Sequence, residues 1–199
     1  MVAVDGYDYA PDANGGPYNK SRALNLAFKH FVTGPEFFAF DLDIVVPPDF
    51  LSSIVRAYAA HGAFAAPRLL YMPPTVQSYR DFAELETTPP IQQWWGAACL
   101  YGSEAFDRVN GFDEDYFGWG NEDDDLHARL AITAGRPGRT NAIRCFHQYH
   151  PRLGPGHAWF SVRRRQANEG RFRQRARRYA SGELGVDEVN GLRPLSLRA

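Results

Sequence analysis

An unbroken row of four carboxylates, residues 122–125, directly follows the turn Gly118-Trp119-Gly120. Neighbouring like charges repel one another, so such a row persists where water solvates it, a metal ion binds it or a reaction uses it. The indole of Trp119 adds a flat apolar surface beside the charges. Sugars combine hydroxyls with apolar C–H faces. The segment therefore predicts a sugar-binding site that combines an indole ring with a carboxylate base. The alternative is an ordinary acidic helix start with Trp119 in the core.

A second acidic pair, Asp41 and Asp43, follows the apolar run 37–40. That run predicts a buried strand, and the ligands of open α/β sheets collect beyond the carboxyl ends of strands. Strand alternation would turn both carboxylates to one side, where they can hold a divalent cation and a phosphate-bearing ligand. A solvated turn after the strand is the alternative.

Two imidazoles, His147 and His150, lie three residues apart. If the backbone bends between them, both can reach one metal ion. With a carboxylate they form a mixed nitrogen and oxygen site that suits Mn²⁺, with Zn²⁺ or Fe²⁺ as alternatives. Without a metal, one imidazole would cap a carbonyl and the other would be exposed.

The acidic segment also has part of the spacing of a calcium loop. Asp113, Asp115, Gly118 and Asp124 fall at positions one, three, six and twelve of an EF-hand-like loop. Phe117 stands at position five, where an oxygen ligand is needed, and the last ligand is Asp rather than Glu. A calcium-binding structural module is therefore an alternative with two mismatches.

Composition is consistent with one globular domain. The chain has 199 residues, of which 44% are hydrophobic. Its net charge of −1 is too small to attract nucleic acid or a membrane surface electrostatically. Cys99 and Cys145 stand far apart and predict reduced, buried thiols and a cytoplasmic protein. No signal-peptide pattern opens the chain and no run approaches 18 apolar residues, so we expect no membrane span.

Strand and helix patterns alternate along the chain, which predicts an α/β fold with a mixed central sheet flanked by helices. We expect helices over 21–31, 50–60, 104–109, 122–134 and 158–180, and strands over 2–4, 37–40, 63–72, 94–101 and 144–149. The proline-bearing stretch 73–90 predicts a long functional loop. We place one domain over residues 1–182 and an irregular tail over 183–199.

Arginines crowd the last predicted helix. They are Arg163, Arg164, Arg165, Arg171, Arg173, Arg175, Arg177 and Arg178. The usual explanation is a solvated face whose long stems cover apolar surface. The alternative is contact with a polyanion such as nucleic acid or an anionic glycan.

The order of these motifs resembles the GT-A (Rossmann-like) glycosyltransferases, and most of all the C-terminal, catalytic half of the β-1,4-galactosyltransferases and their bacterial family 2-like relatives. The matching motifs cover residues 19–25, 41–43, 110–113, 119–125 and the pair His147 and His150. The resemblance implies a metal-dependent inverting transferase. It would move a sugar from a nucleotide-sugar donor, a UDP-sugar, to a hydroxyl of a glycan or another acceptor.

On the donor side, the resemblance implies that Asp43 and His150 bind Mn²⁺, with Mg²⁺ as an alternative ion. His147 falls at the position of a second protein ligand. Asp41 would lie beside the metal, toward the ribose. Two further residues match donor-contacting positions, under the base and near phosphate respectively: Tyr18 and Lys20. Gly96 matches a wall of the site near the donor sugar.

On the acceptor side, the resemblance makes Asp123 the catalytic base. Glu122 and Asp124 would hold acceptor hydroxyls, Gly120 would line the acceptor site, and Trp119 would flank both donor and acceptor sugars.

The resemblance also leaves a gap, because the family opens with a strand–helix–strand unit that binds the nucleotide base. Only residues 1–5 are available for that unit here. We expect a fragment, a trimmed fold, or a partner that supplies the rest. A trimmed sheet exposes a hydrophobic edge, which predicts a homo-oligomer or a covering partner chain. A non-catalytic sugar- or nucleotide-binding remnant is the alternative to an enzyme.

Overall fold

The computed structural model describes residues 19–75, 82–118, 120–135, 138–149 and 162–190. The helices are α1 Lys20–Phe31, α2 Phe50–His61, α3 Phe82–Thr87, α4 Ser103–Arg108, α5 Glu122–Ala134 and α6 Val162–Ser181. The strands are β1 Glu36–Phe40, β2 Ile44–Val45, β3 Phe64–Tyr71, β4 Gln92–Trp95, β5 Ala98–Gly102 and β6 Arg139–His147. The strand expected over 2–4 lies outside the described residues.

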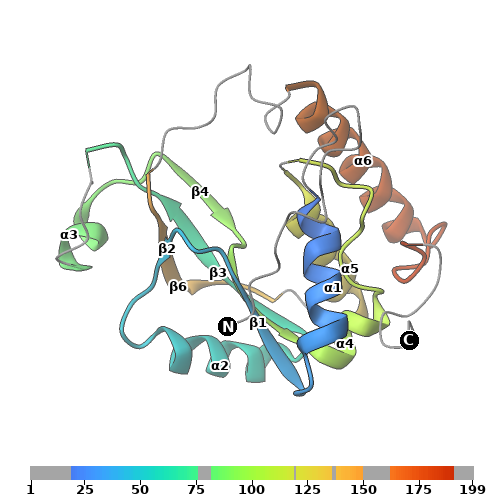
Figure 1. The fold of residues 1–199 in the computed structure, drawn as a ribbon, viewed down its shortest axis with the longest axis horizontal. Coiled ribbons are helices and arrows are strands. Elements are labelled where there is room, and N and C mark those ends of the chain that lie inside the picture. The colour runs from blue at the N-terminus through green and yellow to red at the C-terminus, as the bar shows by residue number, and fades with distance from the viewer. Residues whose placement is uncertain (1–18, 76–81, 119, 136–137, 150–161, 191–199) are drawn as a thin grey trace.

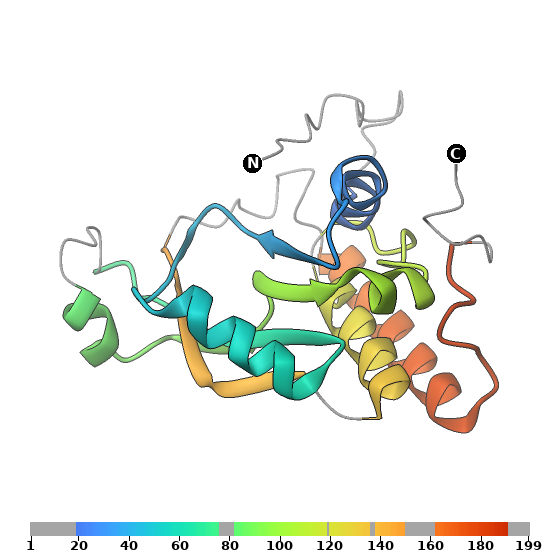
Figure 2. The ribbon, with the colours of Figure 1, turned by 90° about the horizontal axis from the view of Figure 1, so that it is seen from below.

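The strands form one mixed sheet in the order β1-β5-β3-β6-β2, and β4 also pairs with β3. β3 and β6 run parallel, whereas the other pairs are antiparallel. Figures 1 and 2 show α1, α4, α5 and α6 gathered at one end of the molecule, while α2 runs along the sheet. The predicted α/β class with a mixed sheet is confirmed.

Both faces of the sheet are covered, and β5 shows it most clearly because each of its residues is buried. Cys99 and Tyr101 pack into the core beneath α1, α4 and α5. Ala98 and Leu100 point the other way, into the core beneath α2. A strand buried on both faces needs apolar residues at every position, which explains why its sequence shows no alternation.

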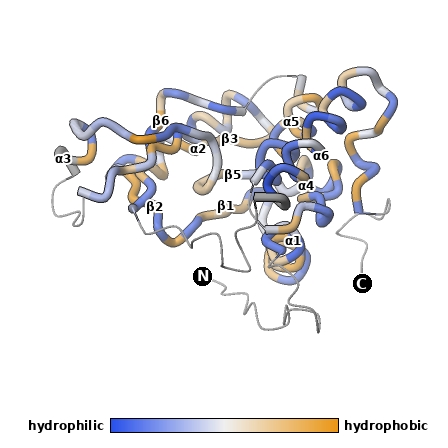
Figure 3. The backbone as a smooth tube through the Cα atoms, turned by 90° about the horizontal axis from the view of Figure 1, so that it is seen from above, coloured by the Kyte–Doolittle hydropathy of each residue, from blue (hydrophilic) through white to orange (hydrophobic). Residues whose placement is uncertain are grey.

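Local signals located the main helices. α1 begins after Asn19, whose side-chain oxygen accepts a hydrogen bond from the backbone of Arg22 at 2.9 Å. The helix predicted over 122–134 is α5, and it ends at Gly135 with a left-handed φ of 68°. Figure 3 shows hydrophobic and hydrophilic stretches along α1, as expected for a helix with one face in the core. No helix in the described part of the chain has both the length and the apolar character needed to cross a membrane.

Several predictions between the helices were wrong in part. The stretch 73–90 contains α3 and so is not a loop throughout. The strand expected over 94–101 is two strands, β4 and β5, separated by Gly96 and Ala97 at φ values of 137° and 62°. Pro67 lies opposite this break on β3, where a residue without an N–H cannot continue the ladder. The strand expected over 144–149 begins earlier, at Arg139.

The buried strand expected over 37–40 lies instead at the end of the sheet. Within the described residues β1 pairs only with β5, and Phe40 is 38% exposed. An end strand has one hydrogen-bonding edge without a neighbouring strand, so its side chains are covered less completely.

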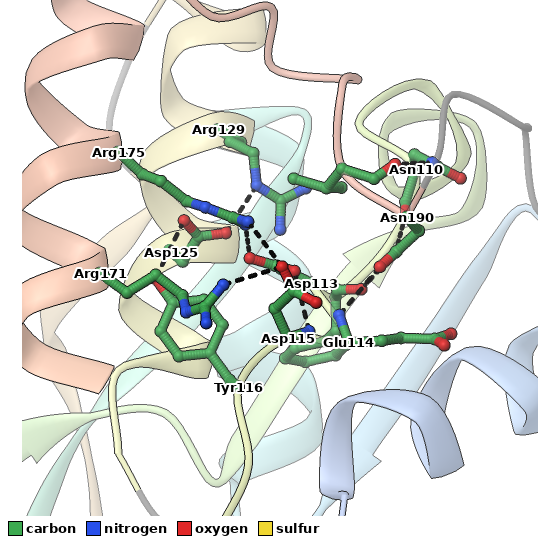
Figure 4. Close-up of polar contacts among 12 residues, drawn as sticks. Asn110, Asp113, Glu114, Asp115, Tyr116, Asp125, Arg129, Arg171, Arg175 and Asn190 are labelled. Atoms are coloured by element: carbon green, nitrogen blue, oxygen red, sulfur yellow. Dashed lines mark hydrogen bonds and ion pairs between the residues drawn. The ribbon is translucent and has the colours of Figure 1, made fainter. Parts of the chain in front are cut away.

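Polar contacts hold the loop that connects α4 to α5, as Figure 4 shows. Arg129 donates hydrogen bonds from Nη1 to the carbonyls of Val109 at 2.6 Å and Gly111 at 2.8 Å. The side-chain oxygen of Asn190 accepts a hydrogen bond from the backbone of Glu114 at 2.9 Å. Residues as late as 190 therefore contact the rest of the fold, while the domain boundary at 182 stays a prediction.

Candidate active site

Lys20 lies among three carboxylates that come from distant parts of the chain. Its Nζ is 3.3 Å from Asp41 Oδ2, 3.9 Å from Glu122 Oε1 and 4.0 Å from Asp123 Oδ2. Lys20 opens α1, Asp41 follows β1, and the two other residues open α5. The structure thus brings together four of the residues that the sequence singled out.

Two asparagines fix the start of α1, and with it the position of Lys20. Asn19 caps the helix and also donates a hydrogen bond from Nδ2 to the Glu114 carbonyl at 2.7 Å. Asn25, further along α1, exchanges hydrogen bonds with the backbone of Phe112 at 2.8 and 2.9 Å. Both partners belong to the loop that leads into α5, so α1 and the acidic helix start are held in one frame.

The break between β4 and β5 brings the backbone against the acidic cluster. A Cβ atom on Gly96 would lie 2.8 Å from Asp123 Oδ2, which is closer than real Cβ contacts allow. The carbonyl of Ala97 accepts a hydrogen bond from the backbone of Asp41 at 2.7 Å. Gly96 was expected to form a wall of the site, and the reason for a glycine there is the close approach of a carboxylate.

Opposing influences act on the Asp123 carboxyl, whose side chain is 24% exposed. Burial raises the pKa of Asp123 to about 7; the charge of Lys20 lowers it, and the charges of Glu122 and Asp41 raise it again. A carboxyl with a pKa near neutrality can accept a proton during a reaction and release it afterwards. Burial lowers the pKa of Lys20, but the three carboxylates outweigh burial and hold that pKa well above its usual value, so Lys20 is a cation.

The four carboxylates at the start of α5 do not face the same surroundings, because each helical residue is rotated from the last. Glu122 turns back and accepts a hydrogen bond from the backbone of Gly120 at 3.1 Å. Asp125 is fully buried with Arg129, at 2.8 Å. Asp125 is therefore part of the core rather than of a solvated charge run.

Asp124, expected to hold acceptor hydroxyls, has two partners within the protein. Its Oδ1 accepts a hydrogen bond from Arg139 Nη2 at 2.5 Å, and its Oδ2 accepts one from Asn121 at 3.1 Å. The Arg139 guanidinium also lies 5.5 Å from the centre of the Trp95 ring. Nothing local in the sequence marks Arg139, which is 15 residues from Asp124, and sequence reasoning missed it.

Beneath this ion pair lies a buried imidazole, His127. Its Nδ1 accepts a hydrogen bond from Arg139 Nε at 3.4 Å, and its Nε2 faces the Tyr101 hydroxyl at 3.1 Å. Its ring stacks on Phe64, with 4.6 Å between centroids. Burial, helped by the nearby Arg139 charge, lowers the pKa of His127 well below its usual value. The neutral imidazole accepts a hydrogen bond from Arg139, the side chain that also binds Asp124 at the start of α5.

Two of the predicted metal ligands, Asp43 and His147, lie in the turn after β1 and at the end of β6. The predicted strand alternation at 41–43 is wrong, because these residues form a turn in which the Ile44 N–H donates to the Asp41 carbonyl at 3.3 Å. Asp43 still reaches His147, with 3.3 Å between Oδ2 and Nε2. The pairing of β2 with β6 produces this contact, since Ile44 lies opposite His147.

The orientation of His147 suits a metal ligand. Its Nδ1 faces the carbonyl of Gln148 at 2.7 Å, and a carbonyl can only accept, so Nδ1 carries the hydrogen. Nε2, which lies 3.3 Å from Asp43 Oδ2, is then the ring nitrogen that a metal ion can bind when the imidazole is neutral. Tyr71 stacks on the imidazole at 4.2 Å between centroids and fixes the ring plane. In the described part of the chain no three potential ligands gather at one point, and His150 lies outside that part, as do Tyr18 and Trp119.

The residues of the calcium-loop alternative face arginines. Asp115 accepts a hydrogen bond from Arg171 at 2.8 Å and another from Arg175 at 3.1 Å. Asp113 also forms an ion pair with Arg175. Figure 4 shows both arginines reaching from α6 to the acidic loop. At least these two arginines of the basic helix therefore have a structural role.

Known proteins that are similar to this chain include β-1,4-galactosyltransferases and a chondroitin sulfate synthase. The sequence profile described as the N-terminal domain of galactosyltransferase matches residues 77–151. β-1,4-Galactosyltransferase 1 of Bos taurus is 26% identical over 129 residues, which make up 63% of this chain and 28% of that protein. Chondroitin sulfate synthase 3 of Homo sapiens is 24% identical over 150 residues, or 68% of this chain and 16% of that protein. The chain thus spans less than a third of the length of these curated relatives.

Solved structures give related matches. The catalytic domain of Drosophila β-1,4-galactosyltransferase 7 in complex with xylobiose has a TM-score of 0.42 and 18% identity, over 88% of this chain and 66% of that chain. A mutant of the same enzyme in complex with manganese, UDP-Gal and xylobiose has a TM-score of 0.39 and 19% identity, over 71% and 50% respectively. The sequence profile and the curated relatives, rather than these structures, show that the chain is galactosyltransferase-like in sequence, as the order of its motifs predicted.

Proposed function

We propose that this galactosyltransferase-like chain carries the metal- and acceptor-binding half of an inverting glycosyltransferase. It transfers a sugar from a nucleotide-sugar donor, a UDP-sugar, to a hydroxyl of a glycan or another acceptor. The observation that supports this most is the position of Asp123, a carboxyl with a pKa of about 7 beside Lys20 and the Gly96 backbone.

In this proposal Asp123 is the general base. As the acceptor O–H bond breaks, Asp123 takes the proton, and the oxygen uses the released electron pair to bond to the anomeric carbon. The bond from that carbon to the phosphate oxygen breaks at the same time, and its electron pair leaves with the nucleoside diphosphate. Attack on the face opposite the leaving group inverts the anomeric configuration.

The donor side is formed by Lys20, Asp41 and the residues around Asp43. Lys20 would supply positive charge near the diphosphate, and Tyr18 is the residue that we propose to contact the nucleotide base. On the acceptor side, we propose that Glu122, Gly120 and Trp119 contact the sugar. A fourth proposed contact is Asp124. Its two bonds to Arg139 and Asn121 mean that an acceptor hydroxyl must share its oxygens.

The residues on the donor side fit a divalent cation. His147 Nε2 lies 3.3 Å from a carboxylate oxygen of Asp43, and an imidazole with a carboxylate is a ligand set that suits Mn²⁺ better than Mg²⁺. We propose Asp43, His147 and His150 as the ligands. When bound, such an ion stabilises negative charge on the departing diphosphate.

The metal site can be tested without an activity assay. Asp43→Ala should weaken Mn²⁺ binding by at least about tenfold, measured by the EPR signal of the free ion. Glu104→Ala is the matched control, because that carboxylate is 87% exposed on α4 and its loss should leave Mn²⁺ affinity unchanged. Equal affinities in the Asp43→Ala variant and the wild type would remove Asp43 from the ligand set.

The transferase proposal is tested by incubating the chain with Mn²⁺, UDP-sugars and candidate acceptors, and by repeating the experiment with Asp123→Asn. Donor hydrolysis or transfer is expected in the wild type only, while both proteins bind donor and metal. Donor binding without turnover in the wild type would instead identify a non-catalytic sugar-binding remnant. Turnover at the wild-type rate in Asp123→Asn would exclude Asp123 as the base.

Two predictions remain, one about a partner chain and one about the location of the protein in the cell. β1 lies at the end of the described sheet with Phe40 half-exposed, so a second copy or a partner chain that covers it stays a prediction, testable by light scattering. The cytoplasmic location suggested by the two buried cysteines also stays a prediction.

A further inference from the structure

Lys20 stands between the two sides of the proposed site. Its Nζ donates a hydrogen bond to Asp41 Oδ2 at 3.3 Å and lies 4.0 Å from Asp123 Oδ2. Asp41 is on the donor side, and Asp123 is the base. Among the described residues Lys20 is the one cation in an ion pair with Asp123.

We propose, building on the function proposed above, that Lys20 is a positioning residue that couples occupancy of the donor site to the basicity of Asp123. Without donor, the Lys20 ammonium stabilises the ionised form of Asp123. A nucleoside diphosphate bound beside Asp41 attracts the ammonium, and ionised Asp123 loses part of that stabilisation. Asp123 thus becomes the stronger base when the donor is in place.

The geometry lets the ammonium move while its backbone stays fixed. Asn19 ties the start of α1 to the Glu114 carbonyl at 2.7 Å, so the Lys20 backbone cannot follow the phosphate. The Lys20 side chain is long and flexible, and its charge is a compact point that can turn between neighbours. It is already closer to Asp41 than to Asp123, so the interaction with Asp123 depends on a small displacement.

The electrostatic surroundings make Asp123 sensitive to that displacement. The titratable groups around it are Lys20 on α1, Asp41 after β1, Cys99 and Tyr101 on β5, and Glu122 and Asp124 on α5. Burial and the neighbouring carboxylates raise the pKa of Asp123, and Lys20 opposes them. An opposite charge within 4–6 Å lowers the pKa of a carboxyl by about 1–3, so withdrawal of Lys20 raises it by a similar amount.

The first test measures proton uptake when a donor binds. Because coupling is reciprocal, a donor that raises the proton affinity of Asp123 takes up protons as it binds. We would titrate UDP-galactose into the chain with Mn²⁺ at pH 7.5, without acceptor, in two buffers of different ionisation enthalpy. The diphosphate of a UDP-sugar is a diester that does not titrate near neutral pH, so the uptake reports on the protein. We expect roughly half a proton in the wild type.

Variants show which residues cause the proton uptake. Asp123→Asn and Lys20→Met should each lose it, whereas Lys20→Arg keeps the positive charge and should retain most of it. Asp123→Asn also accounts for protons exchanged by the metal ligands, which both proteins share. Binding with no uptake in the wild type, or with equal uptake in Lys20→Met, overturns the coupling.

A second test needs no donor. The Asp123 carboxyl is titrated by ¹³C NMR in Lys20→Met, in Lys20→Arg and in a control on the same helix, the exposed Arg22→Met. The pKa of Asp123 should rise by at least about 1 in Lys20→Met and much less in the other two. An unchanged titration in Lys20→Met overturns the coupling, even if transfer is observed. If the titration shifts but no UDP-sugar binds, the proposed transferase function fails instead, and the coupling to a donor fails with it.

Discussion

Replacement of the proposed base, Asp123→Asn, should make the protein more stable at alkaline pH while removing its activity. The substitution keeps the size and shape of the side chain but removes the ionisable group. Burial raises the pKa of Asp123 to about 7, whereas an unfolded chain has a carboxyl pKa near 3.9. Between these values the folded protein holds a proton that the unfolded chain has released.

The direction in which stability changes with pH follows from this difference in bound protons. Stability contributed by the protonated carboxyl is fully present below pH of about 4 and is lost as pH rises to about 7, at about 1.4 kcal/mol per pH unit. At pH 5 the folded wild type carries a neutral Asp123, which resembles the neutral Asn. At pH 8 the wild type holds a partly buried carboxylate, and the variant does not.

The expected magnitude is a gain for the variant of about 2–3 kcal/mol between pH 5 and pH 8. Water reaches the side chain, which is 24% exposed, so a gain of about 1 kcal/mol is the smallest that the reasoning allows. Urea unfolding of both proteins at several pH values, without metal, measures it. The contributions of other titrating groups cancel in the difference between the two free energies of unfolding, because both proteins contain those groups.

The neighbouring carboxylate provides a control with the opposite sign. Asp125→Asn makes the same chemical change two residues along α5, but Asp125 and Arg129 are both fully buried and lie 2.8 Å apart. That variant should be less stable than the wild type at every pH between 5 and 8. A stability difference between Asp123→Asn and the wild type that stays constant from pH 5 to pH 8 would refute the assignment of a raised pKa to Asp123.

Three further predictions follow from the same contacts. Asp125→Asn should lower the free energy of unfolding by about 3–5 kcal/mol, because Arg129 is left buried without its counter-ion. Gly96→Ala should lower transfer by roughly 100-fold, because its Cβ displaces the Asp123 carboxylate; Gly135→Ala, at positive φ but in open space, should lose stability and keep its transfer rate. The transfer rate of the wild type should fall about tenfold per pH unit below pH 7, as Asp123 becomes protonated. A flat rate profile between pH 5 and 7 would contradict the last.

Features that depend on neighbours in sequence were predicted well. α5 covers 122–134 and ends at Gly135, because a left-handed glycine and acidic first-turn residues act within a few residues of the helix end. The start of α1 was located within one residue from the helical spacing of its apolar residues, which is also a local signal. The break at Gly96 and Ala97 was not predicted, because its cause lies across the sheet, where Pro67 faces it on β3.

The sequence alone determined that four carboxylates would stand together at the start of a helix. Only the tertiary structure decided how they differ: Asp123 faces Lys20 and the backbone of Gly96, Asp124 faces Arg139, and Asp125 is buried with Arg129. The physical reason is that the pKa of a carboxyl depends on burial and on charges a few ångströms away. Lys20 lies on another helix and Gly96 in a strand break, so folding has to bring them to Asp123 before that carboxyl differs from its neighbours.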